Sequence, residues 1–444
     1  MIIDFSFKNY KSFKDAQSFS MRRDMSLDFE KESITSTKGE NINRISAIYG
    51  ANAAGKSNFL TALLALRRLV SLGKIEDNNF AGGSEQETLF RLIFEYKEKK
   101  YDYSISAQPQ MVSYEKLSIY YTNQPTLIYE YVAKPRRLKI GNGMIRGDEE
   151  TAVNYNSEKE PSRPILHFLK ESDNVDIKNA FHFFVSGIIP QSMLRGADVS
   201  ETESKLRKIF EQDTPDGKFF NRVIPTADLG IKGVTLVDDE SNLNVDQMNV
   251  IADAIIKINE LGNNKMSDEE EKKLKGLIHQ TVKRISFIHR IGNETLSLKL
   301  EDESNGTVAA SNIFTDLRKV LKNGVVYIVD EIDRSLHPSL VVQLIDIFNS
   351  SETNPHGAQL IFTTHDVSIL DPSIYGRSIL DRDQVWFVEK GNSGESSLYP
   401  LTQIKGTRKE DNLYRKYISG RYGATPKVSL FYEIQKYWES LSNE

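Results

Sequence analysis

Alternating apolar and polar positions predict strands in the first part of the chain. Ile3, Phe5 and Phe7 alternate with polar residues, and a second strand is predicted over 44–49, directly before a glycine-rich turn. Apolar residues then recur at the spacing of a helix, at Phe59, Leu63, Leu66 and Val70. Segments 90–96, 101–107 and 112–121 are rich in Tyr, Phe and Ile and predict a strand meander.

The middle of the chain is more polar. Residues 135–164 are charged and contain glycine, which predicts long loops. Residues 246–261 and 268–289 show helical periodicity on either side of a Gly-Asn-Asn turn, and Ser267 with Glu270 matches a capping box. The sequence therefore predicts a helical hairpin inserted in this region.

From residue 296 onward, strand-like and helix-like segments alternate. Strands are predicted at 296–300, 325–329, 359–363 and 384–389, and helices at 307–321 and 339–349. The run 325–329 is continuously apolar, as expected for a strand buried on both faces. This alternation predicts an α/β fold with a mixed sheet. The expected organisation is an N-terminal part of the core (1–70), an inserted β-meander and helical lobe (71–290), and a C-terminal part of the core (291–444).

The composition narrows the class of protein. Of the 444 residues, 39% are hydrophobic and 27% are charged, which is enough to bury a sizeable core. The formal net charge of -5 argues against a surface that coats nucleic acid, because such binding depends on Lys and Arg. Cysteine is absent, which removes disulfides, zinc–thiolate sites and cysteine nucleophiles. Neither a signal-peptide pattern nor an apolar run of membrane length occurs, so a soluble cytoplasmic protein without membrane contact is expected.

Residues 50–57, GANAAGKS, match the phosphate-binding loop G-x-x-x-x-G-K-[ST] between a predicted strand and a predicted helix. The glycines let backbone N–H groups curl around phosphates, Lys56 reaches the β and γ phosphates, and the Ser57 hydroxyl holds Mg²⁺. The helix that begins here points its positive end at the anion. The residues expected to bind ATP at this loop are Gly50, Asn52, Ala53, Ala54, Gly55, Lys56, Ser57 and Asn58.

The apolar strand 325–329 ends in two carboxylates, Asp330 and Glu331. Asp330 is expected to hold Mg²⁺, directly or through water, and Glu331 to polarise the attacking water as general base. Many buried strands end in acidic turns, so this assignment depends on the phosphate loop upstream. Together the two motifs predict that the chain hydrolyses ATP.

Three further motifs follow the phosphate loop in order: residues 303–307 (ESNGT) at a helix start, 330–338 (DEIDRSLHP), and 363–366 (TTHD) after the next strand. This order resembles the ABC class of ATPases, in the branch that includes SMC, RecF and OLD-type proteins. The resemblance implies an ABC-type ATPase head in which Ser304, Asn305 and Gly306 form the signature that binds the γ-phosphate held by another copy. It also implies that Asp333 belongs to the D-loop at the dimer interface and that His365 is the switch histidine.

Because ESNGT departs from the usual LSGGQ, the signature assignment depends on order and context. The alternatives are an ordinary turn with a helix cap at Ser304 and a structural role for His365. For the glutamine loop, Gln191 is the better candidate and Gln108 is the other.

Within the ABC class, the chain resembles the RloA-type predicted ATPases found in bacterial abortive-infection and phage-defence operons. The residues that carry this resemblance are 303–307, 330–338, 359–365, 382–387 and 420–424. It implies a homodimer, or a larger assembly, that closes head to tail on ATP and regulates a separate effector encoded nearby, with a nuclease as the expected effector. The alternative is a RecF- or SMC-like DNA maintenance ATPase that grips DNA when ATP closes the dimer.

Other charged motifs have two interpretations each. Asp381, Asp383 and Glu389 could contribute to a metal site, but a charged turn before a strand is preferred, and no nuclease domain is predicted in this chain. Two basic clusters suit either a nucleic-acid surface or a solvated face, and the solvated face is preferred. The first cluster contains Lys134, Arg136, Arg137, Lys139 and Arg146, and the second contains Lys405, Arg408, Lys409, Arg415, Lys416 and Arg421, with Tyr414, Tyr417 and Tyr422 between them.

Overall fold

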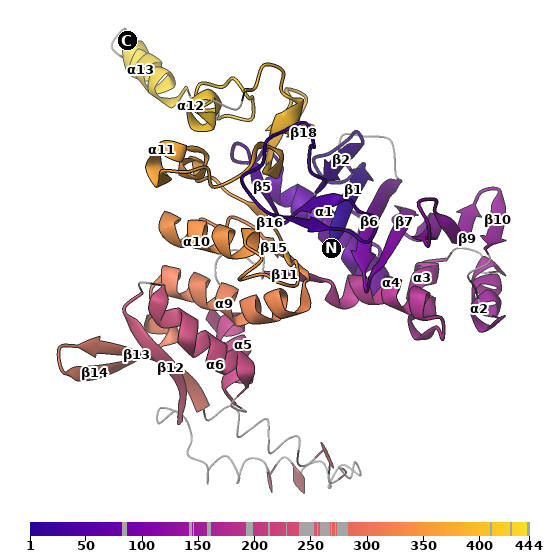
Figure 1. Ribbon diagram of the computed structural model, residues 1–444, viewed down its shortest axis with the longest axis horizontal. Coiled ribbons are helices and arrows are strands. Elements are labelled where there is room, and N and C mark those ends of the chain that lie inside the picture. The colour runs from indigo at the N-terminus through magenta and orange to yellow at the C-terminus, as the bar shows by residue number, and fades with distance from the viewer. Residues whose placement is uncertain are drawn as a thin grey trace. The chain divides into compact units, whose positions relative to one another are not determined.

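The computed structural model describes most of the chain (Figure 1): residues 1–81, 87–141, 144, 146–157, 161–191, 199–211, 214–227, 229–238, 253–254, 256–257, 267, 269–270, 272, 283–408, 411–426 and 429–441. The chain forms two compact units. The first comprises Met1–Gln191, Val320–Asp333 and Pro338–Glu444, and the second comprises Ser192–Lys319 and Arg334–His337. The β-meander therefore belongs to the first unit, and the boundaries at 70 and 290 do not coincide with those of the compact units.

A seven-stranded antiparallel sheet in the first unit has the order β10-β9-β8-β7-β6-β1-β2. Its strands are β1 (Ile2–Lys8), β2 (Gln17–Ser20), β6 (Thr88–Tyr96), β7 (Lys99–Gln108), β8 (Met111–Tyr120), β9 (Thr126–Ala133) and β10 (Arg136–Ile140). On its buried face Phe5 stacks on Phe7 and Phe90, and Phe5 also meets Phe59 of α1 (Lys56–Leu72) at 6.3 Å between ring centroids. This aromatic core fixes the helix that follows the phosphate loop.

A six-stranded sheet in the same unit has the order β11-β15-β16-β5-β17-β18 and is parallel except for β18. Its strands are β5 (Ile45–Tyr49), β11 (Ile188–Pro190), β15 (Val326–Val329), β16 (Gln359–Thr363), β17 (Val385–Lys390) and β18 (Ser396–Pro400). Every residue of β5, β15 and β16 is buried, as expected for parallel strands covered on both faces. Because these three strands are adjacent and parallel, the segments that follow them meet at one edge of the sheet.

The remaining elements of the first unit are helices and a small hairpin. They are β3 (Ser33–Thr35), β4 (Asn41–Asn43), α2 (Arg146–Ser157), α3 (Ile165–Phe168), α4 (Val175–Ser186), α10 (Pro338–Asn349), α11 (Pro372–Tyr375), α12 (Leu413–Ile418), α13 (Leu430–Leu441) and the 3-10 helices η1 (Leu169–Glu171), η4 (Val367–Leu370), η5 (Arg382–Gln384) and η6 (Leu401–Gln403). The prediction of loops over 135–164 was wrong where β10 and α2 form. The polar composition concealed one apolar contact, since Tyr155 of α2 packs edge-on against Tyr131 of β9 at 5.1 Å.

A buried carboxylate joins the meander to α3. Glu115 of β8 is fully buried and accepts hydrogen bonds from the Tyr103 and Tyr129 hydroxyls, at 2.9 and 2.7 Å. It also accepts the backbone N–H groups of Ile165 and Leu166, which belong to the first turn of α3. Burial raises the pKa of Glu115, and these four donors oppose that effect.

The second unit contains a three-stranded antiparallel sheet and helices. Its elements are α5 (Val199–Phe210), α6 (Pro215–Val223), η2 (Ile224–Thr226), β12 (Ile231–Asp238), β13 (Lys283–Ile291), β14 (Glu294–Lys299), η3 (Leu300–Asp302) and most of α9 (Asn305–Asn323). The helix predicted over 268–289 was wrong from Lys283 onward, where β13 forms with Ile285, Ser286 and Phe287 buried. Most of the predicted hairpin lies outside the described residues. The capping box is confirmed, because Ser267 N–H donates to Glu270 Oε2 and Glu270 N–H donates to Ser267 Oγ.

Within the described ranges, no helix has the length and apolar character needed to cross a bilayer.

Candidate functional site

The predicted phosphate loop connects β5 to α1 at the carboxyl edge of the parallel sheet. Ala53 (φ 59°) and Gly55 (φ 117°) adopt left-handed backbone conformations, which turn successive N–H groups toward a common centre. A Cβ atom at Gly55 would lie 2.6 Å from Ser396 Oγ, so a side chain does not fit there. Asn52, Ala53 and Ser57 are exposed, whereas Ala54, Gly55 and Lys56 are buried.

Two serines that the sequence analysis did not single out support this loop. Ser396 Oγ donates to the Ala54 carbonyl at 2.6 Å and lies 2.8 Å from Ser12 Oγ. Asn58, expected to bind nucleotide, donates its side-chain amide to Ser12 Oγ at 2.8 Å. Ser12 and Ser396 are 384 residues apart, so no local pattern could have identified this pair.

Lys56 is buried within the loop that it is expected to serve. Its Nζ donates to the carbonyls of Gly50 and Ala51, at 2.9 and 3.2 Å. Burial lowers the pKa of Lys56, and the charges of Glu331, Asp330 and Asp333 oppose that shift. Neutral carbonyls satisfy an ammonium less well than phosphate oxygens do, because the negative phosphate adds Coulomb attraction to the hydrogen bonds.

Asp330 and Glu331 follow β15 at the same edge and share one partner, Thr363 at the end of β16. The Thr363 hydroxyl donates to Asp330 Oδ1 and accepts the Glu331 backbone N–H at 2.7 Å. Glu331 has a φ of 49°, a conformation that costs a non-glycine residue roughly 1–3 kcal/mol and persists only where the surroundings enforce it. Thr363 therefore holds the Asp330 carboxylate and the Glu331 backbone, a role that the motif alone did not indicate.

His365 and Asp333 lie next to this pair. The His365 backbone N–H donates to both carboxylate oxygens of Asp333, each at 3.2 Å. Burial lowers the pKa of His365 and the charge of Lys56 lowers it further, against the opposing effect of Asp333, Glu331 and Asp330. His365 is thus close enough to Lys56 and the acidic residues to interact with them electrostatically, and the lowered pKa favours its neutral imidazole.

The residues predicted to hold Mg²⁺ have suitable chemistry. Ser57 offers an exposed hydroxyl, and Asp330 offers a carboxylate that Thr363 already orients. Hydroxyl, carboxylate and phosphate oxygens are the ligands that Mg²⁺ prefers, and few of them need to come from the protein. Across the described residues, no cluster of three or more His, Cys, Asp or Glu side chains forms an all-protein metal site.

A pocket of about 700 Å³ lies against the start of the phosphate loop. Gly50, Ala51, Asn52 and His365 line one part of it, and 417–420 with Thr425 and Pro426 line another. Tyr49 also lines the pocket, but within the described residues its hydroxyl is buried without a hydrogen-bond partner, and burial raises its pKa far above the usual value. The C-terminal segment was singled out only by resemblance, and its place beside the loop was not predicted.

Two tyrosines of the second basic cluster, Tyr417 and Tyr422, pack against the parallel sheet. Tyr417 stacks on Phe387 of β17 at 5.3 Å, and Tyr422 is 5.8 Å from the same ring. Both tyrosines are buried, so they are not a stacking surface for bases. Lys416 of the cluster is paired with Asp411.

The predicted signature, Ser304 to Gly306, opens α9 in the second unit. Ser304 Oγ accepts the Thr307 backbone N–H at 3.1 Å, so Ser304 caps the helix, as the alternative interpretation expected. Ser304 and Asn305 remain exposed, and the helix places its positive end beside them. A Cβ at Gly306 would lie 2.8 Å from the Ser335 carbonyl, which explains the glycine. The same Ser304 oxygen also lies 3.1 Å from the Thr307 Oγ1.

Of the two glutamine-loop candidates, Gln191 lies at the relevant edge. It follows β11, and its backbone N–H donates to the Ile328 carbonyl of β15 at 2.8 Å, two residues before Asp330. Gln108 ends β7 in the antiparallel sheet.

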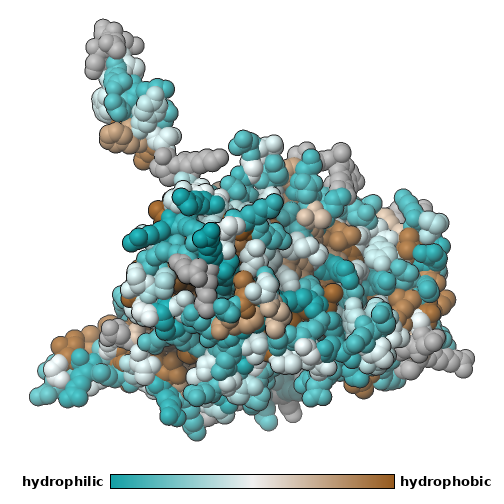
Figure 2. All heavy atoms as spheres, turned by 45° about the horizontal axis from the view of Figure 1, so that its top comes forward, coloured by the Kyte–Doolittle hydropathy of each residue, from teal (hydrophilic) through white to brown (hydrophobic). Residues whose placement is uncertain are grey.

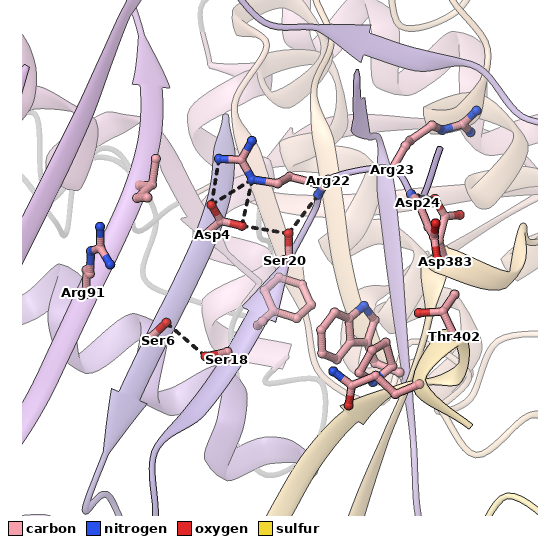
Figure 3. A pocket seen from close by; sticks show the side chains of 15 residues that line it. Asp4, Ser6, Ser18, Ser20, Arg22, Arg23, Asp24, Arg91, Asp383 and Thr402 are labelled. Carbon is pink, nitrogen blue, oxygen red and sulfur yellow. Dashed lines mark hydrogen bonds and ion pairs between the residues drawn. The ribbon is translucent and has the colours of Figure 1, made fainter. Parts of the chain in front are cut away.

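The Asp381–Asp383 pair has a structural role. Asp381 forms a buried ion pair with Arg23 at 3.0 Å and caps η5. Asp383 accepts the Asp24 backbone N–H and lines a separate cavity of about 390 Å³, where Arg22 pairs with Asp4 (Figure 3). The preferred interpretation as a charged turn fits these contacts.

Comparison with known proteins finds a matching family and similar solved structures. No curated protein matches the chain. Among solved structures, it is similar to an SMC head domain from Thermotoga maritima (TM-score 0.39, 15% identity, 90% of this chain and 98% of that chain covered). It is also similar to an Smc head domain with a coiled coil and joint derived from Pyrococcus yayanosii (TM-score 0.36, 12% identity, 91% and 98% covered). The family model described as "AAA domain, putative AbiEii toxin, Type IV TA system" matches residues 45–371, most of the chain. The chain belongs to this family of AAA-domain proteins.

Proposed function

We propose that the chain is an ABC-class ATPase whose two composite active sites form when two copies close head to tail on ATP. The observation that carries this proposal is the convergence of Lys56, Glu331 and His365, with Asp330 and Asp333, at one edge of the parallel sheet. Membership of an AAA-domain family supports nucleotide binding. Each site takes its phosphate loop from one copy and its signature from the other.

The chain's own residues divide the chemistry between them. Lys56 exchanges two backbone carbonyls for the β and γ phosphates. Ser57 and Asp330 would hold Mg²⁺, which would offset phosphate charge. Glu331 accepts a proton from the attacking water, and the Thr363 hydroxyl fixes its position. The neutral imidazole of His365 hydrogen-bonds to the γ-phosphate. From the second copy, Ser304, Asn305 and Gly306 present a helix N-terminus to the same phosphate.

The biological role that we propose is an ATP-dependent sensor or regulatory subunit in anti-phage defence. Its support is the resemblance to RloA-type ATPases and the description of its family in terms of the AbiEii toxin and type IV toxin–antitoxin systems. ATP can shift the dimer equilibrium only through contacts that differ between the open and closed states, and the signature's contact with the γ-phosphate is such a contact. The output comes from a separate effector, which we propose is a nuclease encoded nearby.

A Glu331→Gln variant tests the composite site, because it keeps the shape of the side chain and removes the base. We expect it to bind Mg-ATP, hydrolyse it at least about 100-fold more slowly, and accumulate as a dimer that contains two nucleotides per two chains. Lys56→Ala is the matched control that fails to bind ATP. The measurement is the mass of each protein with and without Mg-ATP, alone and after co-expression with the neighbouring gene product. A Glu331→Gln protein that stays monomeric with Mg-ATP would contradict the sandwich dimer.

One observation favours the DNA-maintenance alternative. Lys134, Arg136, Arg137 and Lys139 are exposed together on the β9–β10 hairpin. If this hairpin grips DNA, ATP-dependent affinity must fall steeply as salt rises, and a variant that replaces all four cations with Ser must lose it. Absence of DNA binding at low salt would reject the alternative.

A further inference from the structure

The last helix, α13, exposes an apolar stripe along its length. All of its residues from Leu430 to Ser440 are exposed. Leu430 is 65% exposed, Phe431 83%, Ile434 48%, Tyr437 59% and Trp438 61%. Figure 1 labels the helix next to the C-terminus, and in Figure 2 it stands at the upper left with apolar atoms on its surface. Aromatic residues of this kind are the ones that most often anchor protein interfaces.

The stripe is confined to one side of the helix. At 100° per residue, these five positions lie within about 60° of Ile434 on either side, which is the width of a core-facing helix surface. The opposite side carries Tyr432, Lys436 and Glu439, with Lys436 placed over the Tyr432 ring at 4.8 Å. The helix therefore has a face built to be buried and a face suited to water.

The spacing of the apolar positions in the stripe is the same from both ends of the helix. Around Ile434, large apolar residues occur three and four positions before it and three and four positions after it: Leu430 and Phe431 on one side, Tyr437 and Trp438 on the other. A two-fold interface needs a self-complementary patch, in which residue i meets residue j of the partner and j meets i. An antiparallel pair of α13 helices that crosses at Ile434 sets Leu430 on the partner's Trp438 and Phe431 on the partner's Tyr437, and it brings no like charges together.

The exposed area suits this pairing. Aromatic side chains present about 150–250 Å² each when fully exposed, so the five side chains together present roughly 600 Å² at their observed exposures. Two such helices bury roughly 1,200 Å² in total, which reaches the lower bound of specific, stable interfaces. The exposed patch of roughly 600 Å² on a single helix is as large as the largest apolar patches that monomeric proteins leave in water.

We propose that α13 is a self-association element that pairs with α13 of a second copy and holds two chains together without nucleotide. Such a tether raises the effective concentration of the two ATPase heads into the millimolar range, so ATP closes a dimer that already exists. Pro426, which lines the pocket at the phosphate loop, precedes α13 by only a few residues. The tether itself does not depend on the proposed ATP-closed dimer.

The test is the mass of the full chain without nucleotide, measured over a concentration series. We expect the wild type to be dimeric and Ile434→Glu to weaken the dimer by roughly 30-fold or more, since Ile434 is the centre of the stripe. Tyr432→Glu is the matched control: it also places an acid at an exposed position of α13, on the opposite face, and should remain dimeric.

Three outcomes would overturn the proposal: a monomeric wild type at micromolar concentration, equal dimerisation of Ile434→Glu and wild type, or a 1:1 complex of wild type with a different protein that Ile434→Glu loses. A variant that ends after Ser429 checks the result without relying on one side chain. Binding of ATP by Ile434→Glu should equal that of the wild type. In the Ile434→Glu background, where the tether is lost, dimerisation that requires Mg-ATP reports the sandwich dimer alone, so the failure of one proposal can be told from the failure of the other.

Discussion

Replacing Thr363 by Val tests whether its hydroxyl positions the catalytic carboxylates. Valine keeps the shape of this fully buried side chain and removes both hydrogen bonds. The Glu331 N–H then loses its acceptor, which costs about 1–3 kcal/mol, and Asp330 loses a charge-assisted bond of about 1.5–3 kcal/mol. Because such terms are not additive, we expect a destabilisation of about 3 kcal/mol.

The effect on catalysis should be larger than the effect on binding. Glu331 occupies a costly left-handed conformation that its bond to Thr363 helps to hold, so the carboxylate shifts when that bond is lost. A displacement of about 1 Å at a catalytic group costs on the order of 100-fold in rate. We therefore expect kcat for ATP hydrolysis to fall about 100-fold while KM changes little, because Lys56 and the loop are untouched.

Thr363→Ser is the matched control. It keeps the hydroxyl and removes one buried methyl group, which costs about 1 kcal/mol of stability and leaves kcat near the wild-type value. Phosphate release gives the rates, and urea unfolding gives the stability. If Thr363→Val and Thr363→Ser hydrolyse ATP equally fast, Thr363 does not position the base and the reasoning fails.

Two further predictions concern buried and titrating groups. Glu115→Ala leaves two tyrosine hydroxyls and two backbone N–H groups without their acceptor. Urea unfolding should therefore show that the free energy of unfolding falls by about 3–5 kcal/mol, while the ATP affinity of the folded protein is unchanged. A fall below about 1 kcal/mol would show that Glu115 does not join β8 to α3. The pKa of His365 is lowered in the folded chain, so below pH 6.5 the unfolded chain binds more protons than the folded chain does. The free energy of unfolding that His365 contributes is therefore fully present above pH 6.5. It is lost as the pH falls through the folded pKa of His365. Without nucleotide, acidification should therefore destabilise the wild type more than His365→Asn, and identical pH profiles would reject this sign.

The parts of the fold that were predictable are those where local pattern and burial agree. The segment 325–329 is continuously apolar and the segment 359–363 has an apolar centre, and the structure buries each residue of β15 and β16. In contrast, 283–291 contains apolar residues at both period 2 and period 3, and only pairing with β12 and β14 selects the strand. The segment 135–164 is polar, and contacts such as Tyr155 with Tyr131 decide its structure. Sequence periodicity carries no information about such partners.

The candidate site also has parts that the sequence predicted and parts that it did not. The phosphate loop and the acidic pair are local motifs, and the parallel sheet brings them to one edge. Thr363, Ser12 and Ser396 were missed because each acts on residues 32 to 384 positions away. The signature and the switch histidine came from resemblance, and their roles in ATP binding remain predictions.

The central claim is that each ATPase site joins the phosphate loop of one copy to the signature of another, and complementation between two inactive variants tests it most directly. Lys56→Ala removes the phosphate contact, and Ser304→Asp keeps the helix cap while placing a negative charge where the γ-phosphate of the other copy would bind. Ser304→Asn, which caps the helix without charge, is the control. Alone, neither inactive variant should release phosphate from ATP. Mixed in equal amounts, they should recover roughly a quarter of the wild-type rate, because random pairing gives half heterodimers and each has one intact site. A mixture as inactive as its components would contradict the composite site and assign Ser304 to its own chain's structure alone.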